Sequence, residues 1–444
     1  MWQRSPRRPT RPATGGGAMR GKLIVAMSVL ALVGAACTGS SATGTQSEAP
    51  GGPATAPSET LLLGTGSGPI LVEVPAGAVL FEQAGSVASL GGHWLLSAED
   101  SEGSTLLSTR DAATGNVVGT TQVPGELDVR VVSESGRAVA LMDPLPKGWD
   151  PFVPLPRATT RIVVADPTGA AEPRTFDLVG NYEPEAFAAA DDALFLIQHL
   201  PAETPQAYRV TMLDLDLGRV RPVFGPFKGP AERMPGIRLQ QVLPPTANQL
   251  YTLYSSARPG YLPHDGSGTD GRVVSFVHVL SLRDGWAHCA GLPESMWDRP
   301  SAEQAMAAAP DGTALYVVDA GRGEVAILDT ASLEMRTAEV DLGPSGAIER
   351  TTAQMSADGR TLFVATAGPE GSSVTAIDVG TFEVLDRWSV QGRISSLGLS
   401  GDGARLYAAT GDGLVVLDAA NGREMAAVPV DAPDAVTQVL AIAS

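Results

Sequence analysis

Nine charged residues stand at or near the beginnings of short strand-like runs. Mixed charges that converge on one concave surface could recognise a polar ligand or position a metal. The alternative is a solvated rim of ion pairs that contribute little energy. The choice between a ligand site and a rim of ion pairs depends on whether the fold brings the beginnings of these strands together. The nine residues are Asp128, Arg130, Glu185, Arg238, Glu303, Glu349, Arg350, Arg393 and Asp434.

Two histidines and a cysteine form a second candidate site, for a metal. His278, His288 and Cys289 fall on one predicted hairpin, where two or three of them could hold zinc or copper. The alternative is a pair of half-exposed histidines beside a buried thiol. We favour this alternative and predict no metal site.

Sequence signatures of catalysis are absent. The chain has no GxSxG, complete P-loop or HExxH pattern, and its two cysteines are too far apart for CxxC. The single GxGxxG match, Gly266–Gly271, precedes a strand-like run, where a dinucleotide site needs a helix. The calcium-loop likeness of His264–Gly271 fails because Asp270 and Phe276 stand at two required positions. We expect no cofactor and favour a protein that is not an enzyme.

A repeated pattern between Glu73 and Gly422 supplies the elements that must position the charged residues. Its clearest copies begin at Pro310, Ala357 and Gly401. A period of roughly 40 to 50 residues with four short strands is typical of a β-propeller blade. We therefore predict an all-β fold over residues 59–444, a β-propeller of eight four-stranded blades, with seven blades as the alternative. The first strand of each blade lines the central channel, which places the nine charged residues at the channel mouth.

A carboxylate ends the third strand of most repeats, usually with a glycine three or four residues later. Asp accepts hydrogen bonds from backbone N–H groups in turns, and Gly adopts positive φ, so we predict a structural role. Ser281 replaces the acid in one repeat, and Leu333 and Phe382 replace the glycine in two others. The carboxylates are Glu73, Asp111, Asp166, Asp214, Asp329, Asp378 and Asp418.

The two ends of the propeller domain complement each other. Thr60–Ala84 supplies three strands, and Asp434–Ala443 resembles a missing first strand. Joining them would close the ring and remove open sheet edges. Long insertions at Asp143–Ala158 and Ser255–Gly271 could cap one face.

From Ala302 to its end the chain resembles the YVTN/lactonase-like and PQQ-like propeller repeats of bacterial envelope proteins. Arg110–Gly115 and Leu417–Gly422 are similar to the PQQ-type repeat. In quinone-binding members a Trp follows that glycine by four residues and locks neighbouring blades. Gly119 and Ala426 stand at those positions here, so the resemblance implies a propeller without a bound quinone.

The N-terminus has the pattern of a signal peptide. Arg20 and Lys22 precede Leu23–Ala36, an apolar run too short to span a bilayer. Val33–Cys37 resembles the bacterial lipobox, which implies cleavage before Cys37 and lipid attachment to its thiol. The alternative is an ordinary secretory signal with a coincidental cysteine.

This resemblance divides the chain into a signal peptide (1–36), a lipidated Cys37 with a flexible tether (37–58) and the propeller domain (59–444). The segment 38–58 is almost wholly small and polar and cannot bury enough apolar area to fold. Cleavage removes six basic and no acidic residues, leaving a net charge near −24. Nucleic acid would repel such a protein, so no nucleic-acid partner is expected. The predicted location is the extracytoplasmic face of the cell membrane, held by the lipid anchor.

Two functions follow from these patterns. The favoured one is a lipid-anchored binding or scaffold module for an envelope protein or a small polar ligand. The alternative, which rests on fold analogy, is a metal-assisted lactonase-like hydrolase that uses acidic residues at the channel mouth.

Overall fold

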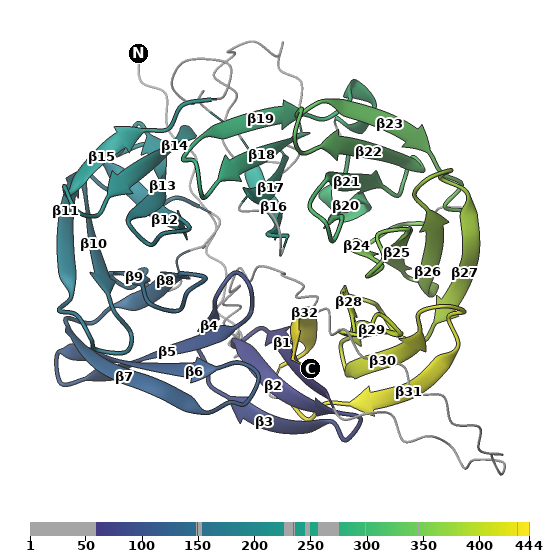
Figure 1. Ribbon diagram of the computed structural model, residues 1–444, viewed down its shortest axis with the longest axis horizontal. Helices are drawn as coiled ribbons and strands as arrows, with labels where there is room; N and C mark the ends of the chain where they lie inside the picture. The colour runs from purple at the N-terminus through teal and green to yellow at the C-terminus, as the bar shows by residue number, and fades with distance from the viewer. Residues whose placement is uncertain are drawn as a thin grey trace, which may run out of the picture.

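The computed structural model describes residues 59–147, 149, 153–225, 234, 236–244, 249–255, 275–297, 299–343, 346–432 and 434–443. The predicted signal peptide, Cys37 and the tether lie outside these residues, as does nearly all of the second insertion. The described residues form eight four-stranded antiparallel sheets arranged radially around a central channel (Figure 1). The predicted eight-bladed β-propeller is confirmed.

Each blade runs from an innermost to an outermost strand. Blade 1 joins β32 (Val436–Ala443) to β1 (Glu59–Thr65), β2 (Pro69–Val74) and β3 (Ala78–Glu82). Blade 2 contains β4 (Val87–Ala88), β5 (Trp94–Ser101), β6 (Ser104–Asp111) and β7 (Val117–Pro124). Blade 3 contains β8 (Asp128–Val132), β9 (Val139–Met142), β10 (Thr159–Ala165) and β11 (Arg174–Val179). Blade 4 contains β12 (Asn181–Phe187), β13 (Ala193–Leu200), β14 (Ala207–Asp214) and β15 (Arg219–Pro222).

The remaining blades follow the same order. Blade 5 contains β16 (Ile237–Val242), β17 (Gln249–Ser255), β18 (Ser275–Ser281) and β19 (Ala287–Gly291). Blade 6 contains β20 (Gln304–Ala308), β21 (Ala314–Asp319), β22 (Glu324–Asp329) and β23 (Met335–Glu339). Blade 7 contains β24 (Arg350–Met355), β25 (Thr361–Gly368), β26 (Gly371–Asp378) and β27 (Val384–Val390). Blade 8 contains β28 (Ser396–Leu399), β29 (Arg405–Thr410), β30 (Gly413–Asp418) and β31 (Glu424–Pro429). Two 3₁₀ turns, η1 (Glu294–Met296) and η2 (Ser301–Glu303), lead into blade 6.

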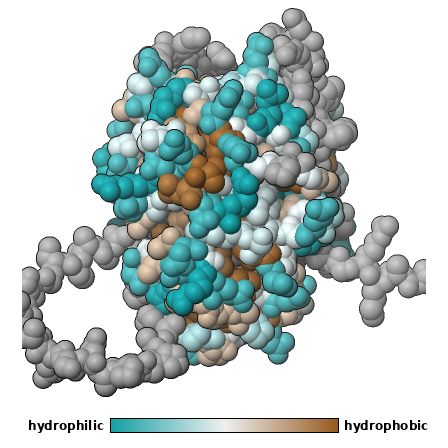
Figure 2. Space-filling view, turned by 90° about the vertical axis from the view of Figure 1, so that its right-hand side faces the viewer, coloured by the Kyte–Doolittle hydropathy of each residue, from teal (hydrophilic) through white to brown (hydrophobic). Residues whose placement is uncertain are grey.

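Burial explains why the repeats fold as strands. The middle strands are apolar on both faces, because each blade packs between two others; every residue of β29 is buried. The outermost strands alternate instead, and β3 reads exposed and half-buried in turn. Seen from the side of blades 6 and 7, the outer rim mixes hydrophilic residues with small apolar groups (Figure 2). Leu385 of β27 is 58% exposed on this rim.

The ring is closed as predicted. Strand β32, from the C-terminus, pairs antiparallel with β1 and becomes the innermost strand of blade 1. A buried ion pair reinforces this closure, with Arg405 Nη2 of blade 8 lying 2.6 Å from Glu59 Oε1 of β1. The Tyr407 hydroxyl donates a hydrogen bond to the other oxygen of the same carboxylate. The first residue of the domain is therefore fixed at the end of the channel opposite the mouth, where β29 begins.

The recurring carboxylates make turns, as the sequence predicts. Asp111 Oδ1 accepts hydrogen bonds from the backbone N–H groups of Ala113 and Thr114. Asp329 and Asp378 do the same in blades 6 and 7, and backbone N–H donation lowers the pKa of both carboxyls below their usual range. Ser281 substitutes through its hydroxyl oxygen, which accepts from Asp284 N–H.

The glycine of each turn lies against the preceding blade. Gly422 of blade 8 sits under the Trp388 ring of blade 7, and an added Cβ would overlap that ring. Gly119 and Ala426 occupy the positions at which quinone-binding propellers have a tryptophan. Trp388 lies at a different position of the repeat, but it also packs two blades together. The αL glycine thus provides the space into which the neighbouring outer strand fits.

Leu333 and Phe382 adopt the same left-handed conformation without being glycine, with φ of 61° and 59°. Each side chain packs against the core cluster between its own blade and the preceding one. The Phe382 ring also lies under the Arg336 guanidinium of blade 6, whose Cζ is 5.7 Å from the ring centroid. Packing therefore compensates for backbone strain of about 1 kcal/mol per residue.

Two substitutions of Leu333 separate strain from packing. Leu333→Ala removes the packing and keeps the strain, whereas Leu333→Gly removes both. We expect the glycine variant to be the more stable by about 1 kcal/mol, the reverse of the usual order in regular structure. Urea unfolding of the two variants measures the difference. An alanine variant as stable as the glycine variant would show that the αL backbone is not strained here.

Candidate functional site: the channel mouth

The channel mouth is the end at which the innermost strands begin, and a repeated device fixes the backbone there. A glycine with positive φ precedes several of these strands, including Gly125, Gly180 and Gly392. In blade 3, Thr160 Oγ1 donates to the Gly180 carbonyl and accepts from Tyr182 N–H. Thr105 and Ser372 make the same pair of hydrogen bonds before β8 and β28. The charged residues that follow therefore project from well-anchored backbone.

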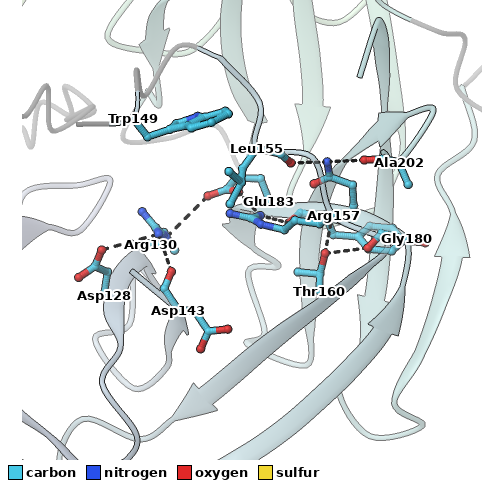
Figure 3. A network of polar contacts seen from close by, with 12 residues as sticks. Asp128, Arg130, Asp143, Trp149, Leu155, Arg157, Thr160, Gly180, Glu183 and Ala202 are labelled. Atoms are coloured by element: carbon cyan, nitrogen blue, oxygen red, sulfur yellow. Dashed lines mark hydrogen bonds and ion pairs between the residues drawn. The ribbon is translucent and has the colours of Figure 1, made fainter. Parts of the chain in front are cut away.

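Blades 3 and 4 share one charged network at the mouth (Figure 3). Arg130 Nη2 lies 3.7 Å from Asp128 Oδ2, and Arg130 Nε lies 3.7 Å from Glu183 Oε1. The second oxygen of Glu183 lies 3.0 Å from Arg157 Nη1. Arg130 also donates to the Asp143 carbonyl at 3.0 Å, which ties the first insertion to the mouth. Arg130 Nε has no hydrogen-bond acceptor among the described residues.

The described part of the first insertion is anchored beside this network. Asn181 Nδ2 donates to the Leu155 carbonyl at 2.7 Å and to the Ala202 carbonyl at 3.0 Å. Trp149 Nε1 donates to the Val153 carbonyl at 2.7 Å, and Figure 3 shows its ring above the Arg130 and Glu183 side chains. The described residues of this insertion therefore lie at the mouth of blades 3 and 4.

Two exposed apolar side chains belong to the segments that flank the network. Val179 is 86% exposed and Val153 is 43% exposed. They lie in neighbouring segments, because Gly180 N–H donates to the Ala158 carbonyl at 2.8 Å. We group the charged and apolar residues of these adjoining segments as the blade 3–4 mouth surface, defined by Arg130, Trp149, Val153, Arg157, Val179 and Glu183.

Blades 4 and 5 are joined by a second charged pair. Arg238 Nη1 lies 2.9 Å from Glu185 Oε2, and Gln241 Nε2 donates to Glu185 Oε1 at 2.6 Å. Burial alone would lower the pKa of Arg238, but the charge and hydrogen bond of Glu185 outweigh it and raise that pKa. This pair joins two blades, and the Glu185 side chain is 5% exposed.

The other predicted residues form separate groups around the mouth. Glu303 pairs with Arg299, which also lies 3.3 Å from the buried Asp319. Glu349 pairs with Arg393 of the next blade. Arg350 donates to the Ser395 carbonyl at 2.9 Å, and burial lowers its pKa. Asp434 lies beside Gly66 in blade 1.

Eight of the nine predicted residues thus lie at or near strand beginnings on one face, in local groups, whereas Glu185 lies deeper, at the fifth of the seven positions of β12. Most of the acids face an arginine, and the described residues contain no group of three or more His, Cys, Asp or Glu that could hold a metal. Glu183, Arg157 and Arg299 also belong to these groups and were not predicted from the sequence. Glu183 precedes Glu185 by two residues in β12, but a β-bulge between Pro184 and Ala186 interrupts the alternation of side chains. Glu183 therefore contacts arginines on the blade 3 side, whereas Glu185 contacts Arg238 of blade 5. Arg157 and Arg299 lie in loops between strands, where the alternation of apolar and polar residues does not predict the direction of a side chain.

The histidine–cysteine hairpin exists, with a different burial from the one predicted. His278 of β18 is directly opposite Cys289 of β19, and His288 is opposite Val279. His278 is buried and Cys289 is exposed, the reverse of the expected arrangement. Burial, with a smaller effect of the nearby His288, lowers the pKa of His278 to about 4.

Glu134 is a titratable group at the opposite end of the channel, in the turn between β8 and β9. Its Oε1 accepts a hydrogen bond from Gly91 N–H of blade 2 at 2.6 Å. Burial raises the pKa of this carboxyl to about 7, although the Gly91 hydrogen bond acts the other way; Asp191 raises it further. The folded protein therefore keeps the proton that the unfolded chain loses near pH 4.5.

A raised carboxyl pKa makes stability fall as pH rises. The contribution of Glu134 is fully present below pH 4.5 and is lost as pH rises to about 7, a change on the order of 3 kcal/mol. Glu134→Gln should reduce this slope, which denaturant unfolding at several pH values between 4.5 and 7 measures. An unchanged slope in the glutamine variant would show that Glu134 titrates normally in the folded protein.

No helix among the described residues is both long and apolar enough to cross a membrane. A scan against protein-family models finds no match, and no curated protein matches the chain significantly.

Solved structures do match. Apo AztD from Citrobacter koseri is 12% identical with a TM-score of 0.51, over 87% of this chain and 98% of that chain. A putative 6-phosphogluconolactonase from Bacteroides fragilis is 13% identical with a TM-score of 0.40, over 87% and 97% respectively. BamB from Moraxella catarrhalis is 14% identical with a TM-score of 0.39, over 80% and 94% respectively. At these identities the likeness concerns the fold alone: the chain is an eight-bladed β-propeller closed by its two terminal strands.

Proposed function

We propose that this protein is a lipid-anchored, extracytoplasmic β-propeller that binds a partner protein through the blade 3–4 mouth surface. The observation that carries the proposal is the exposure of Val179 and Val153 beside the Arg130–Glu183–Arg157 network. Protein interfaces combine apolar contact with a polar rim in this way. The anchored strand beginnings keep the surface rigid, which lowers the entropic cost of binding.

The end of the channel at which the N-terminal tether joins the domain is consistent with partner binding at the mouth. The sequence predicts lipid attachment at Cys37, and the domain begins at Glu59, at the end of the channel opposite the mouth. A flexible tether of 21 residues would span about 25 Å on average. The mouth would then face away from the anchoring membrane and stay accessible to another envelope protein.

A small polar ligand and metal-assisted hydrolysis receive less support. Glu185, Glu303 and Glu349 each face an arginine, which satisfies their charge without a cation. Hydrolysis at the mouth would need a carboxylate that is not paired with an arginine and can therefore contact a substrate or a metal ion.

The proposal is tested by affinity capture from native membranes with matched variants. Val179→Glu places a charge in the mouth surface, and Leu385→Glu makes the same change on the rim of blade 7. We expect the captured partner to be lost with Val179→Glu and kept with Leu385→Glu, with both variants folded by circular dichroism. Capture of no partner, together with robust turnover of a lactone by the purified domain, would contradict the proposal and favour the hydrolase.

A further inference from the structure

A cavity of about 580 Å³ lies between blades 7 and 8, at the end of the channel opposite the mouth. Its wall is formed by the turns that follow β24, β28 and β30 and by the beginnings of β25 and β29. A volume of this size is within the range of small-molecule sites, about 300–1,000 Å³. The lining includes Asp358, Phe363, Asp402, Ala404, Asp418 and Met425.

The next interface of the ring shows why this space remains between blades 7 and 8. Between blades 8 and 1, the Glu59 carboxylate reaches across to Arg405 and to the Tyr407 hydroxyl. Ala404 occupies the position of Glu59 in blade 8, one residue before the strand partner of the turn carboxylate. Phe363 occupies the position of Tyr407 in blade 7, two residues after that partner. Neither side chain supplies the polar group that joins the blades in the next interface, so a cavity is left here.

Three carboxylates line the cavity, from Asp358, Asp402 and Asp418. Hydrogen bonds from the Ser356 and Ser400 hydroxyls, together with backbone N–H groups, lower the pKa of Asp358 and Asp402. Both carboxyls are therefore ionised at neutral pH. These bonds use one oxygen of Asp358, and its Oδ2 accepts no hydrogen bond from the described residues.

Two arginines lie close to these carboxylates but leave the cavity negative. Arg405 Nη2 is 3.4 Å from Asp402 Oδ2, but it lies closer, at 2.6 Å, to the buried Glu59. Arg423 is 73% exposed and lies 3.9 Å from Asp418, a distance at which solvent screens much of the attraction. The cavity is therefore suited to a cation.

Apolar side chains complete the wall, with Phe363 buried and Met425 46% exposed. We propose that this cavity binds an organic ammonium ion, with its alkyl chain against Phe363 and Met425 and its charged end among the three carboxylates. Hydrogen bonds from an ammonium group to carboxylates are stronger than those between neutral groups, and aromatic rings attract cations. The described residues contain no group of three His, Cys, Asp or Glu placed to hold a metal, which favours an organic cation over a metal ion. This site is independent of the blade 3–4 mouth surface.

Calorimetric titration of the full chain with n-hexylammonium chloride at low ionic strength tests the proposal. Hexanol, which has the same chain without the charge, is the matched probe. We expect hexylammonium to bind with one-to-one stoichiometry, about tenfold or more tighter than hexanol. Asp358→Asn and Asp418→Asn should each weaken binding about three- to fivefold, the range of partly exposed ion pairs.

Asp311→Asn is the control variant. Asp311 holds the equivalent turn of blade 6 through Thr313 and does not line the cavity, so this variant should bind like the parent. Asparagine keeps an oxygen that can accept the backbone hydrogen bonds of each turn. Hexanol binding as tightly as hexylammonium, or undiminished binding in both Asp358→Asn and Asp418→Asn, would overturn the site.

Methyl NMR of the parent gives a readout that does not depend on the folding of a variant. The Met425 methyl resonance should shift during the titration, whereas that of Met306, buried between blades 5 and 6, should not. An unchanged Met425 resonance would contradict the proposal. Spermidine and Nα-acetyl-lysine amide then distinguish a free polyamine from a lysine side chain of a partner. Binding of either supports the site and the tighter binder identifies the source, whereas binding of neither contradicts it.

Discussion

Arg405→Met is expected to lower the free energy of unfolding by about 3–5 kcal/mol, because it leaves the Glu59 carboxylate buried without its cation. Arg405 and Glu59 have side chains 5% and 7% exposed, and they join blade 8 to the strand that completes blade 1. Loss of the pair therefore weakens the closure of the whole ring. Denaturant unfolding measures the change.

Arg423→Met is the matched control. Its guanidinium is 73% exposed and lies 3.9 Å from Asp418, so its removal should cost less than about 1 kcal/mol. Replacing Glu59 by leucine together with Arg405→Met should recover much of the loss, because no buried charge then remains. If Arg405→Met costs no more than Arg423→Met, the buried pair does not hold the ring closed.

Gly422→Ala is expected to cost more than about 3 kcal/mol, from overlap with a buried ring and a left-handed backbone. Gly422 has φ of 67°, and its Cβ would enter the volume of the Trp388 ring. Trp388 is 7% exposed and cannot move out without opening the contact between blades 7 and 8. Thermal or denaturant unfolding of the variant gives the cost.

Gly103→Ala isolates the backbone contribution. Gly103 has φ of 84°, and nothing lies within 4 Å of its added Cβ, so only about 1 kcal/mol should be lost. In a Trp388→Ala background Gly422→Ala should fall to the same level, since the clash is gone. Equal costs for the two glycines in the parent protein would show that the Trp388 contact does not require glycine.

The repeat made the fold predictable. Four strands per unit and a terminal strand at Asp434–Ala443 led to eight blades and ring closure, and β32 pairs with β1 as expected. The Asp–Gly turns were also predictable, because turn chemistry is local. The docking of Trp388 on Gly422 was not, since it depends on the relative position of two blades that the repeat alone does not specify.

The site was predictable only in part. Strand beginnings could be placed at the mouth from the repeat, and eight of the nine charged residues lie at or near them, but Glu185 lies deeper in β12. Their partners could not be predicted: Arg157 reaches Glu183 from an insertion, and Arg299 reaches Asp319 from the turns before blade 6. Val179 is exposed because it ends β11 on the face opposite Phe176 and Leu178, which are buried; its apolar side chain does not reveal this orientation in the sequence.

Site-specific photo-crosslinking in intact cells tests the proposed binding surface most directly. A photoreactive residue replaces Val179 or Val153 in the mouth surface, and Leu385 on the outer rim as the control. We expect one discrete protein adduct from both mouth positions and none from Leu385. An adduct from Leu385 alone, or no adduct from either mouth position, would contradict it.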